Sequence, residues 1–311
     1  MSAGVDALGS LHDDETDEEN EILELERKLE LARARRAGHR GGHGHAAHPS
    51  VTPNTASPAD PLTSSYHFLL LLSDSALPLG AFAFSSGLES YLAHHRGGNG
   101  PRPASFSAFL PVSVSSYAST TLPFVLAAHR DPSATADLDD ALDAAIICTV
   151  GRRASVAQGR ALLGIWERSF ASSLPAEAAS ALKPFTALLR SSPGSAAAGG
   201  GWDATGLPPV SAHLAPLFGA IANLVGLSLA QTAYVFMLSH VKALISAAVR
   251  ASMFGPYQAQ KILASREVQG MIAAMVDREW DTRVEDAGQS VPVMDLWIGR
   301  HEVLYSRIFN S

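Results

Sequence analysis

The sequence predicts an all-α protein: a single helical bundle domain of many helices, preceded by an acidic tail that is disordered or partly helical. Three observations support this prediction. From Leu62 onward, apolar residues recur at the three- and four-residue spacing of helices. No series of alternating strands separated by hairpin turns occurs. Two long uncharged segments have the composition of helices that are buried on nearly all faces.

The first 61 residues are set apart by their charge. They hold twelve of the thirty acidic and six of the 23 basic residues, a net charge of −6, and leave the other 250 residues at −1. Ile22, Leu25, Leu29 and Ala32 have heptad-like spacing, which is typical of a short coiled-coil helix. We favour a solvated, partly helical tail, because isolated short helices are marginally stable. Residues 62–311 then form the helical domain, with a low-complexity loop at 191–211.

A linker rich in Gly, Pro and Ser follows the acidic part of the tail and contains His39, His43, His45 and His48. Imidazole binds Ni(II), Cu(II) and Zn(II), but a Gly-rich chain imposes no ligand geometry. Two alternatives stay open: a weak nickel-binding tract at His43, His45 and His48, and a biased linker without function, which we favour. No firm metal site is predicted.

The string LLLLSDSALPLGAFAFSSGLES, residues 69–90, predicts a packed turn between two helices. Pro78 fixes φ, and Gly80 supplies the positive φ that a sharp reversal needs. Phe82 and Phe84 follow as alternating apolar anchors.

Ser85 or Ser86 is placed to cap the second helix, whose first turn holds Glu89, where a carboxylate suits the helix dipole. We therefore expect Gly80, Phe82, Ser85 and Glu89 to shape this corner.

Amphipathic helices are expected further along the chain. The apolar stripes are Leu138, Ala141, Leu142, Ala145 and Ile146; Leu162, Ile165, Trp166 and Phe170; and Val268, Met271, Ile272, Met275 and Val276. In the first stripe, Asp137, Asp139 and Asp140 suit the N-terminus of the helix.

The uncharged segments span residues 104–128 and 214–239. The second is long enough to cross a bilayer, which needs roughly 20 apolar residues. Both are interrupted by polar residues, and the first contains two prolines, so we predict core helices and keep an integral membrane protein as the alternative.

The sequence offers little chemistry. There is no G-x-S-x-G, H-E-x-x-H or P-loop motif. The nearly neutral body and the lack of aromatic and Arg interleaving argue against nucleic-acid binding. Cys148 is the single cysteine and lies in an apolar run, which predicts a buried, inert thiol. An all-α hydrolase whose Ser, His and Asp residues are brought together by folding remains the rival hypothesis.

The string at 69–90 resembles the N-terminal signature of the urease accessory protein UreF family, with a eukaryotic-type N-terminal tail added. Two departures are Ala81, where the family more often has Gly, and Phe84, where it more often has His, so no role of that His carries over. Further matches follow in order along the chain: Arg153–Ser155, Gln158–Arg160, His213, Pro216, Phe218, Gly219, Ser246–Arg250 and His301–Ser311.

This resemblance implies a protein that is not an enzyme. A cytoplasmic location is expected from the single cysteine and from the acidic tail, which stands where a secretory pattern would be. The protein's implied role is chaperone-like: it assists nickel insertion and metallocentre assembly in apo-urease by bridging a UreD/UreH-type accessory protein and a UreG-type GTPase. Nickel is then the cargo of the complex rather than a firmly bound cofactor. A homodimer is left open, and neither nucleic acid nor membrane is expected as a partner.

The corner residues Gly80, Phe82, Ser85 and Glu89 are predicted to contact partners, and so are five further residues. Arg153 and Arg160 are expected to make polar contacts, with an intramolecular salt bridge as the alternative. Tyr305, Arg307 and Phe309 are expected to form a C-terminal docking element, because Tyr and Arg are frequent in binding hot spots. The alternative is that this segment folds back onto its own core as a final helical turn.

Overall fold

The computed structural model describes residues 64–96, 104–191 and 209–310, which all belong to one unit of the chain. Every regular element in these residues is helical, which confirms the all-α prediction. The α-helices are α2 (Ser64–Ser73), α3 (Leu88–Arg96), α4 (Phe106–Arg130), α5 (Thr135–Ala145), α6 (Thr149–Ile165), α7 (Ala176–Ser180), α8 (Lys183–Ser191), α9 (Leu214–Leu224), α10 (Leu229–Arg250), α11 (Pro256–Leu263), α12 (Arg266–Glu279) and α13 (Val293–Arg300). Short 3₁₀ or π-helical turns lie between them: η1 (Ala81–Ala83), η2 (Pro132–Ala134), η3 (Trp166–Phe170), η4 (Ala171–Ser173), η5 (Val284–Asp286) and η6 (His301–Val303).

Three of the predictions concern segments outside the described residues. These are the acidic tail, the histidines of the linker and most of the loop predicted at 191–211. The boundary between residues 61 and 62 therefore stays a prediction.

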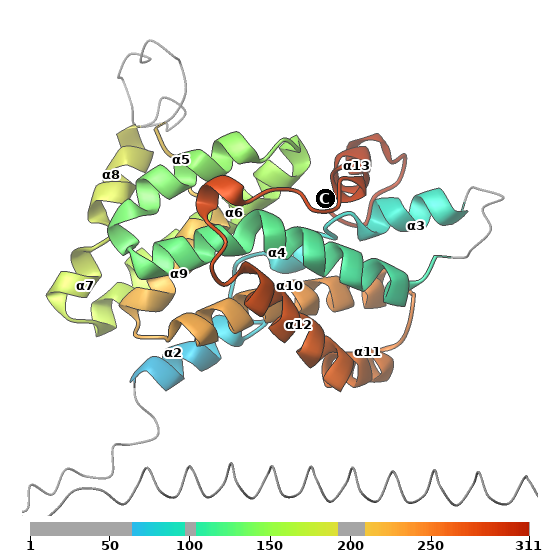
Figure 1. Ribbon diagram of the computed structural model, residues 1–311, viewed down its shortest axis with the longest axis horizontal. Helices are drawn as coiled ribbons and strands as arrows, with labels where there is room; N and C mark the ends of the chain where they lie inside the picture. Colours follow the sequence, from blue (N-terminus) through green and yellow to red (C-terminus); the bar gives the residue numbers. More distant parts are fainter. Residues whose placement is uncertain (1–63, 97–103, 192–208, 311) are drawn as a thin grey trace, which may run out of the picture. The chain divides into compact units, whose positions relative to one another are not determined.

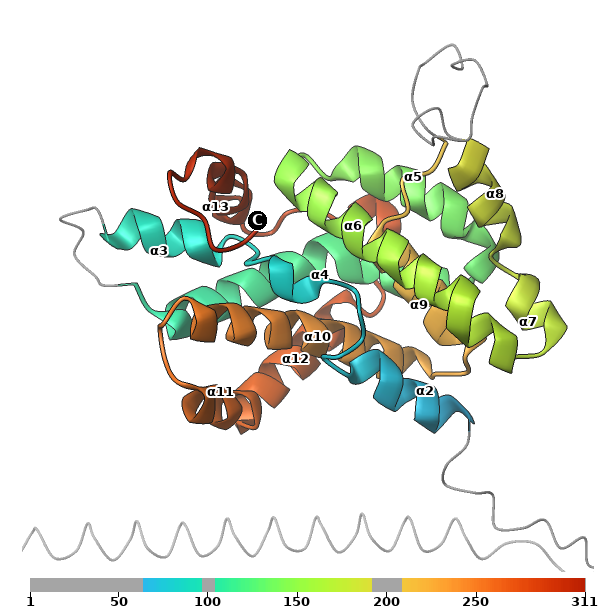
Figure 2. The ribbon, with the colours of Figure 1, turned by 180° about the vertical axis from the view of Figure 1, so that it is seen from behind.

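Helix α4 lies at the centre of the described unit and packs against α5, α9, α10 and α12 (Figure 1). Figure 2 shows these helices from behind, with α2 alongside α10. Phe109, Val114, Leu122 and Val125 of α4 are fully buried. Full burial of such a side chain contributes about 1.5–3 kcal/mol, so the core is built around this helix.

A proline inside α4 creates the attachment point for the segment that precedes α13. Pro123 has no N–H, so the carbonyl of Ser119 has no helical partner. That carbonyl instead accepts the N–H of Gly288 at 3.1 Å, and the Ser119 hydroxyl donates to Ser290 Oγ at 2.9 Å. The segment is thereby fastened to the middle of the central helix.

Two glycines allow helix α9 to approach its neighbours closely. A Cβ on Gly219 would lie 2.1 Å from the carbonyl oxygen of Val125 in α4. A Cβ on Gly159 in α6 would lie 2.1 Å from the carbonyl oxygen of Ala212, just before α9. Any side chain at either position would push backbone apart, so both contacts require glycine.

The second uncharged segment is two helices rather than one. Helix α9 ends at Leu224, Gly226 has a φ of 84°, and α10 begins at Leu229. Ser228 and Gln231 form a capping box at the start of α10. Within the described residues, α4 and α10 are long and apolar enough to cross a membrane, yet 67% and 61% of their apolar windows are buried in the protein. Packing against other helices accounts for their apolar character.

The three predicted stripes are helical, except for Ile146, which follows the end of α5. Their residues are buried or partly buried apart from Ala141 and Ala145, which are exposed, so the prediction of an apolar core face is wrong for these two. The first lies in α5, the second in α6 and η3, and the third in α12. In α12, Val268, Ile272 and Val276 are buried, while Met271 and Met275 are partly buried.

Candidate partner-binding surface

The predicted corner forms at Gly80. This residue has a φ of 72° and precedes η1, which confirms the expected positive φ. A Cβ at Gly80 would meet no atom within 4 Å, so the requirement for glycine is one of backbone conformation and not of space.

Phe82 lies on the surface and not in the core. Its side chain is 65% exposed, so the prediction of an apolar anchor is wrong for this residue; Phe84 is half-buried. The Phe82 carbonyl accepts a hydrogen bond from the Arg250 guanidinium, which also lies 4.3 Å from the centre of the Phe309 ring. The corner is therefore tied to the end of α10 and to the C-terminal segment, while the Phe82 ring faces solvent.

Ser85 and Glu89 are buried inside the chain. Glu89 lies in the first turn of α3, as predicted, and its N–H reaches the Ser85 hydroxyl at 3.4 Å. The helix itself begins at Leu88, because Ser86 and Gly87 both have positive φ, at 49° and 85°. Buried side chains shape the corner but do not lie on its surface, which corrects the prediction that these two contact a partner directly.

The Glu89 carboxylate holds the C-terminal segment. Its Oε2 atom accepts from His301 Nε2 at 3.0 Å and from the Phe309 N–H at 3.2 Å, and its Oε1 atom accepts from the Ile308 N–H at 2.6 Å. His301 is fully buried. The helix-dipole argument correctly placed Glu89 in the first turn of α3. It could not predict that the carboxylate binds the C-terminal segment, because these partners lie more than two hundred residues away in sequence.

The C-terminal segment folds back onto the chain in one part and stays exposed in another. Phe309 is 4% exposed and belongs to the core, which corrects its assignment to a docking element. Among residues 304–310, which the structure describes, no final helical turn forms. Tyr305 is fully exposed and Ile308 is 62% exposed, while Arg307 pairs with Glu302 at 3.2 Å.

Arg153 and Arg160 both make intramolecular contacts. Arg153 forms an ion pair with Glu302, the alternative that the sequence left open. Arg160 Nε donates to the carbonyl of Ser211 at 3.2 Å. Both side chains retain exposed surface, and their contact with a partner stays a prediction.

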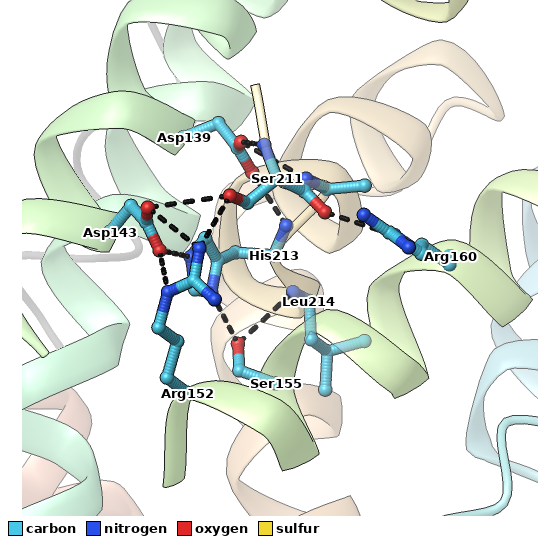
Figure 3. A network of polar contacts seen from close by, with 9 residues as sticks. Asp139, Asp143, Arg152, Ser155, Arg160, Ser211, His213 and Leu214 are labelled. Atoms are coloured by element: carbon cyan, nitrogen blue, oxygen red, sulfur yellow. Dashed lines mark hydrogen bonds and ion pairs between the residues drawn. The ribbon is translucent and has the colours of Figure 1, made fainter. Parts of the chain in front are cut away.

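Sequence reasoning missed a polar network that joins α5, α6 and the start of α9 (Figure 3). Asp139 was assigned to the N-terminus of its own helix, but it is fully buried. Its carboxylate accepts the backbone N–H groups of Ser211, Ala212 and His213 at 2.6, 3.0 and 2.5 Å. Asp139 therefore fixes the backbone that leads into α9, including the N–H of its N-cap residue His213, where the helix dipole favours an anion.

Asp143, one helical turn after Asp139, is the second acid of this network. Burial alone would raise the pKa of its carboxyl, but hydrogen bonds from Arg152 and His213 outweigh burial and hold that pKa below its usual value. Arg152 donates through Nε and Nη2 at 2.5 and 2.9 Å. The i, i+4 spacing of the two acids on one helix face was the signal available in the sequence.

The same network contains a Ser, a His and an Asp in contact, the arrangement that the rival hydrolase hypothesis requires. His213 Nε2 lies 2.8 Å from Asp143 and His213 Nδ1 lies 3.0 Å from the Ser155 hydroxyl. However, Ser155 Oγ also accepts the N–H of Leu214 at 3.3 Å, and Arg152 already neutralises the carboxylate that would stabilise a protonated imidazole. The network serves to fix α9 against α5 and α6.

Within the part of the chain that the structure describes, no group of three or more His, Cys, Asp or Glu residues is arranged to hold a metal ion. His43, His45 and His48 lie outside that part. Cys148 is half-buried at the start of α6, so the expected full burial of its thiol is wrong.

Comparison with known proteins agrees with this fold. The UreF family model matches residues 102–267. An uncharacterized UreF-like urease accessory protein of Schizosaccharomyces pombe is 34% identical over 246 residues, which cover 79% of this chain and 97% of the relative. Urease accessory protein F of Oryza sativa subsp. indica is 33% identical, with 76% and 82% covered. Urease accessory protein UreF of Paenarthrobacter aurescens is 30% identical, with 77% and 95% covered.

The fold and the site define an all-helical protein whose polar networks join helices and whose exposed apolar side chains suit binding. The chain belongs to the UreF family of urease accessory proteins. This is a family of accessory proteins and not of enzymes, which decides against the hydrolase hypothesis.

Proposed function

We propose that this UreF family member assists nickel insertion into apo-urease by linking a UreD/UreH-type accessory protein to a UreG-type GTPase. In this proposal the protein acts in the cytoplasm as a chaperone-like binding component of metallocentre assembly. Nickel is the cargo of the complex. The chain contributes surfaces and not catalytic groups.

One observation carries the proposal: exposed apolar side chains are concentrated near the C-terminus. The most exposed of them are Leu296, Val303, Tyr305 and Ile308, which are 62%, 74%, 107% and 62% exposed, and we call these four the C-terminal apolar set. Large apolar side chains that stay exposed close together in sequence are candidate contacts for a protein partner.

The backbone behind this set is held in place. Phe309 is buried next to Ile308, and Glu89 accepts the N–H groups of both residues. A segment fixed before binding loses less conformational entropy when a partner arrives. Tyr305 is therefore presented on an ordered segment, and a Tyr of this kind is typical of a binding hot spot.

Co-expression with a UreD/UreH-type partner, followed by size-exclusion chromatography and titration of the purified proteins, tests the proposal. Tyr305→Ser is expected to weaken the complex by roughly thirtyfold, which corresponds to about 2 kcal/mol. Tyr257→Ser is the matched control, because Tyr257 is 92% exposed on a different helix, α11. Equal affinities for the parent and Tyr305→Ser would contradict this assignment of the surface.

The bridging role is tested separately with a UreG-type GTPase. We expect a ternary complex in which this chain contacts both partners, and we expect Tyr305→Ser to keep its contact with the GTPase. If the two partners associate equally well without this chain, the bridging role is wrong. Size-exclusion chromatography of the chain alone also shows, from its apparent size, whether it forms a homodimer.

The linker histidines are a separate question within this proposal. Calorimetry with Ni(II), on the parent and on a variant with His43, His45 and His48 changed to Ala, distinguishes a weak nickel tract from a linker without function. Unchanged nickel affinity in that variant would exclude the tract.

A further inference from the structure

A cavity of about 380 Å³ lies among the signature corner, α4, α6 and α13. It is partly open to solvent, so a small molecule can enter it. Its volume falls in the range of small-molecule sites, roughly 300–1,000 Å³. None of the C-terminal apolar set lines this space, whereas Ser155 and Leu214 of the polar network do.

Most polar groups on the cavity wall carry no charge. His240 and Tyr117 stack with their ring centres 3.9 Å apart, and His240 Nε2 lies 3.2 Å from the Ser113 hydroxyl. Burial lowers the pKa of His240 to about 3 and raises the pKa of the Tyr117 hydroxyl, so both are neutral near pH 7. The rest of the wall is mainly apolar, including Met294 and Ile298 of α13.

Asp295 is the exception. Among the described residues that line the cavity, it is the one with an acidic side chain, and none of them is Lys or Arg. Ser116 Oγ donates to Gln289 Oε1 at 2.7 Å, and Gln289 Nε2 donates to Asp295 Oδ1 at 3.0 Å. This chain of hydrogen bonds fixes the carboxylate, and no basic side chain in the described residues forms an ion pair with it.

We propose that the cavity binds a small organic amine, with its apolar body among the neutral side chains and its ammonium group at Asp295. An ammonium donates hydrogen bonds that a half-buried carboxylate accepts, and charge-assisted bonds of this kind are roughly twice as strong as neutral ones. A carboxylate ligand of the same size would face Asp295 as a like charge. The cavity is therefore expected to bind cationic ligands more tightly than anionic ligands of the same size.

The test uses the full chain alone and three ligands of matched size: 2-phenylethylamine, 2-phenylethanol and 3-phenylpropionate. Calorimetry is expected to give the highest affinity for the amine and the lowest for the carboxylate. Asp295→Asn is expected to weaken amine binding about tenfold, or about 1.4 kcal/mol, while leaving the alcohol unchanged. Asp277→Asn removes the same charge from the exposed face of α12 and is expected to change nothing.

A second variant, Ala154→Phe, places a ring in the cavity and is expected to abolish binding of the amine and the alcohol; circular dichroism checks its fold. If Ala154→Phe does not fold, the comparison of Asp295→Asn with the parent still tests whether the amine binds at Asp295. The proposal is overturned if the three ligands bind equally, if none binds at millimolar concentration, or if Asp295→Asn keeps full amine affinity. In the last case Asp295 serves only the N-terminus of α13. None of these measurements involves urease or its partners, so failure here leaves the proposed function standing.

Discussion

Replacing Glu89 by Ala is expected to release the C-terminal segment and to destabilise the protein by about 3 kcal/mol. The change removes the acceptor of three hydrogen bonds, from His301, Ile308 and Phe309. A buried donor left without an acceptor costs about 1–3 kcal/mol. If the segment leaves its site instead, the burial of Phe309 is lost, which costs about 1.5–3 kcal/mol along with the three bonds.

Urea unfolding and thermal melting measure this loss. For a domain of this size, each kcal/mol lowers Tm by about 2–4 °C, so a decrease of about 6–12 °C is expected. Hydrogen exchange adds a local measurement, because the amides of Ile308 and Phe309 should lose protection before the rest of the chain. Glu89→Gln keeps one oxygen acceptor and should lose less stability than Glu89→Ala.

Glu267→Ala is the matched control. Glu267 also occupies the first turn of a helix, α12, but its side chain is exposed. A carboxylate that acts on the helix dipole alone contributes about 0.3–1 kcal/mol, so the control separates that effect from the long-range contacts. Equal Tm values for the two variants, with protection retained at Ile308 and Phe309, would refute the reasoning.

Three further predictions concern backbone conformation, a buried carboxylate and a buried imidazole. Gly80→Val should lower the free energy of unfolding in urea by about 1–3 kcal/mol, because a β-branched residue is strained at φ 72°. Gly255→Val should cost less, because Gly255 has a φ of −83° and a Cβ there also meets no atom within 4 Å. Equal losses of stability in the two variants would show that φ is not the cause. Asp139→Ala leaves three backbone donors unpaired and should lower the free energy of unfolding by at least about 3 kcal/mol. Asp140→Ala is the control, because Asp140 is exposed, and it should change stability little. Similar stabilities of the two variants would contradict the role of Asp139 at the start of α9. Burial lowers the pKa of His240 from 6.5 to about 3, so below pH 6.5 the unfolded state binds a proton that the folded state does not. The free energy of unfolding should therefore fall by up to about 1.4 kcal/mol for each pH unit below 6.5. The fall should be shallower in His240→Leu, and parallel curves of stability against pH for the parent and the variant would refute this reasoning.

The helices could be predicted from the sequence because their signal is local. The stripe Val268, Ile272 and Val276 repeats every four residues, and burial of that face follows from the spacing. The sequence also contains a local signal for the break between α9 and α10, although our prediction did not use it. Ser228 and Gln231 have the S-x-x-Q spacing of a capping box, and Gly226 precedes them, but the long run of apolar residues concealed this boundary.

The buried carboxylates could not be predicted in the same way, because their partners are distant in sequence. Asp139 and Glu89 both lie near the start of a helix, where a local argument assigns an acid to the dipole of that helix. In the structure each accepts hydrogen bonds from a different segment, more than 70 residues away for Asp139 and more than 200 for Glu89. Only the tertiary fold decides which acid faces inward.

The strings that carry the family resemblance prove to be paired in space. Glu89, from the signature at 69–90, binds the backbone of Ile308 and Phe309, from the last string of the chain. Arg250, which ends the string Ser246–Arg250, contacts both of these ends through Phe82 and Phe309.

A second pair forms between α6 and the start of α9. Ser155, from the string around Arg153, contacts His213, which opens the next string. Gly159 and Gly219 hold α9 against α6 and α4, where a Cβ would meet a carbonyl oxygen. Each string alone looks like an isolated surface motif, yet each is half of a contact between helices. A substitution in one string is therefore expected to disturb the other member of its pair before it disturbs any partner protein, and stability must be measured alongside binding for every variant made in them.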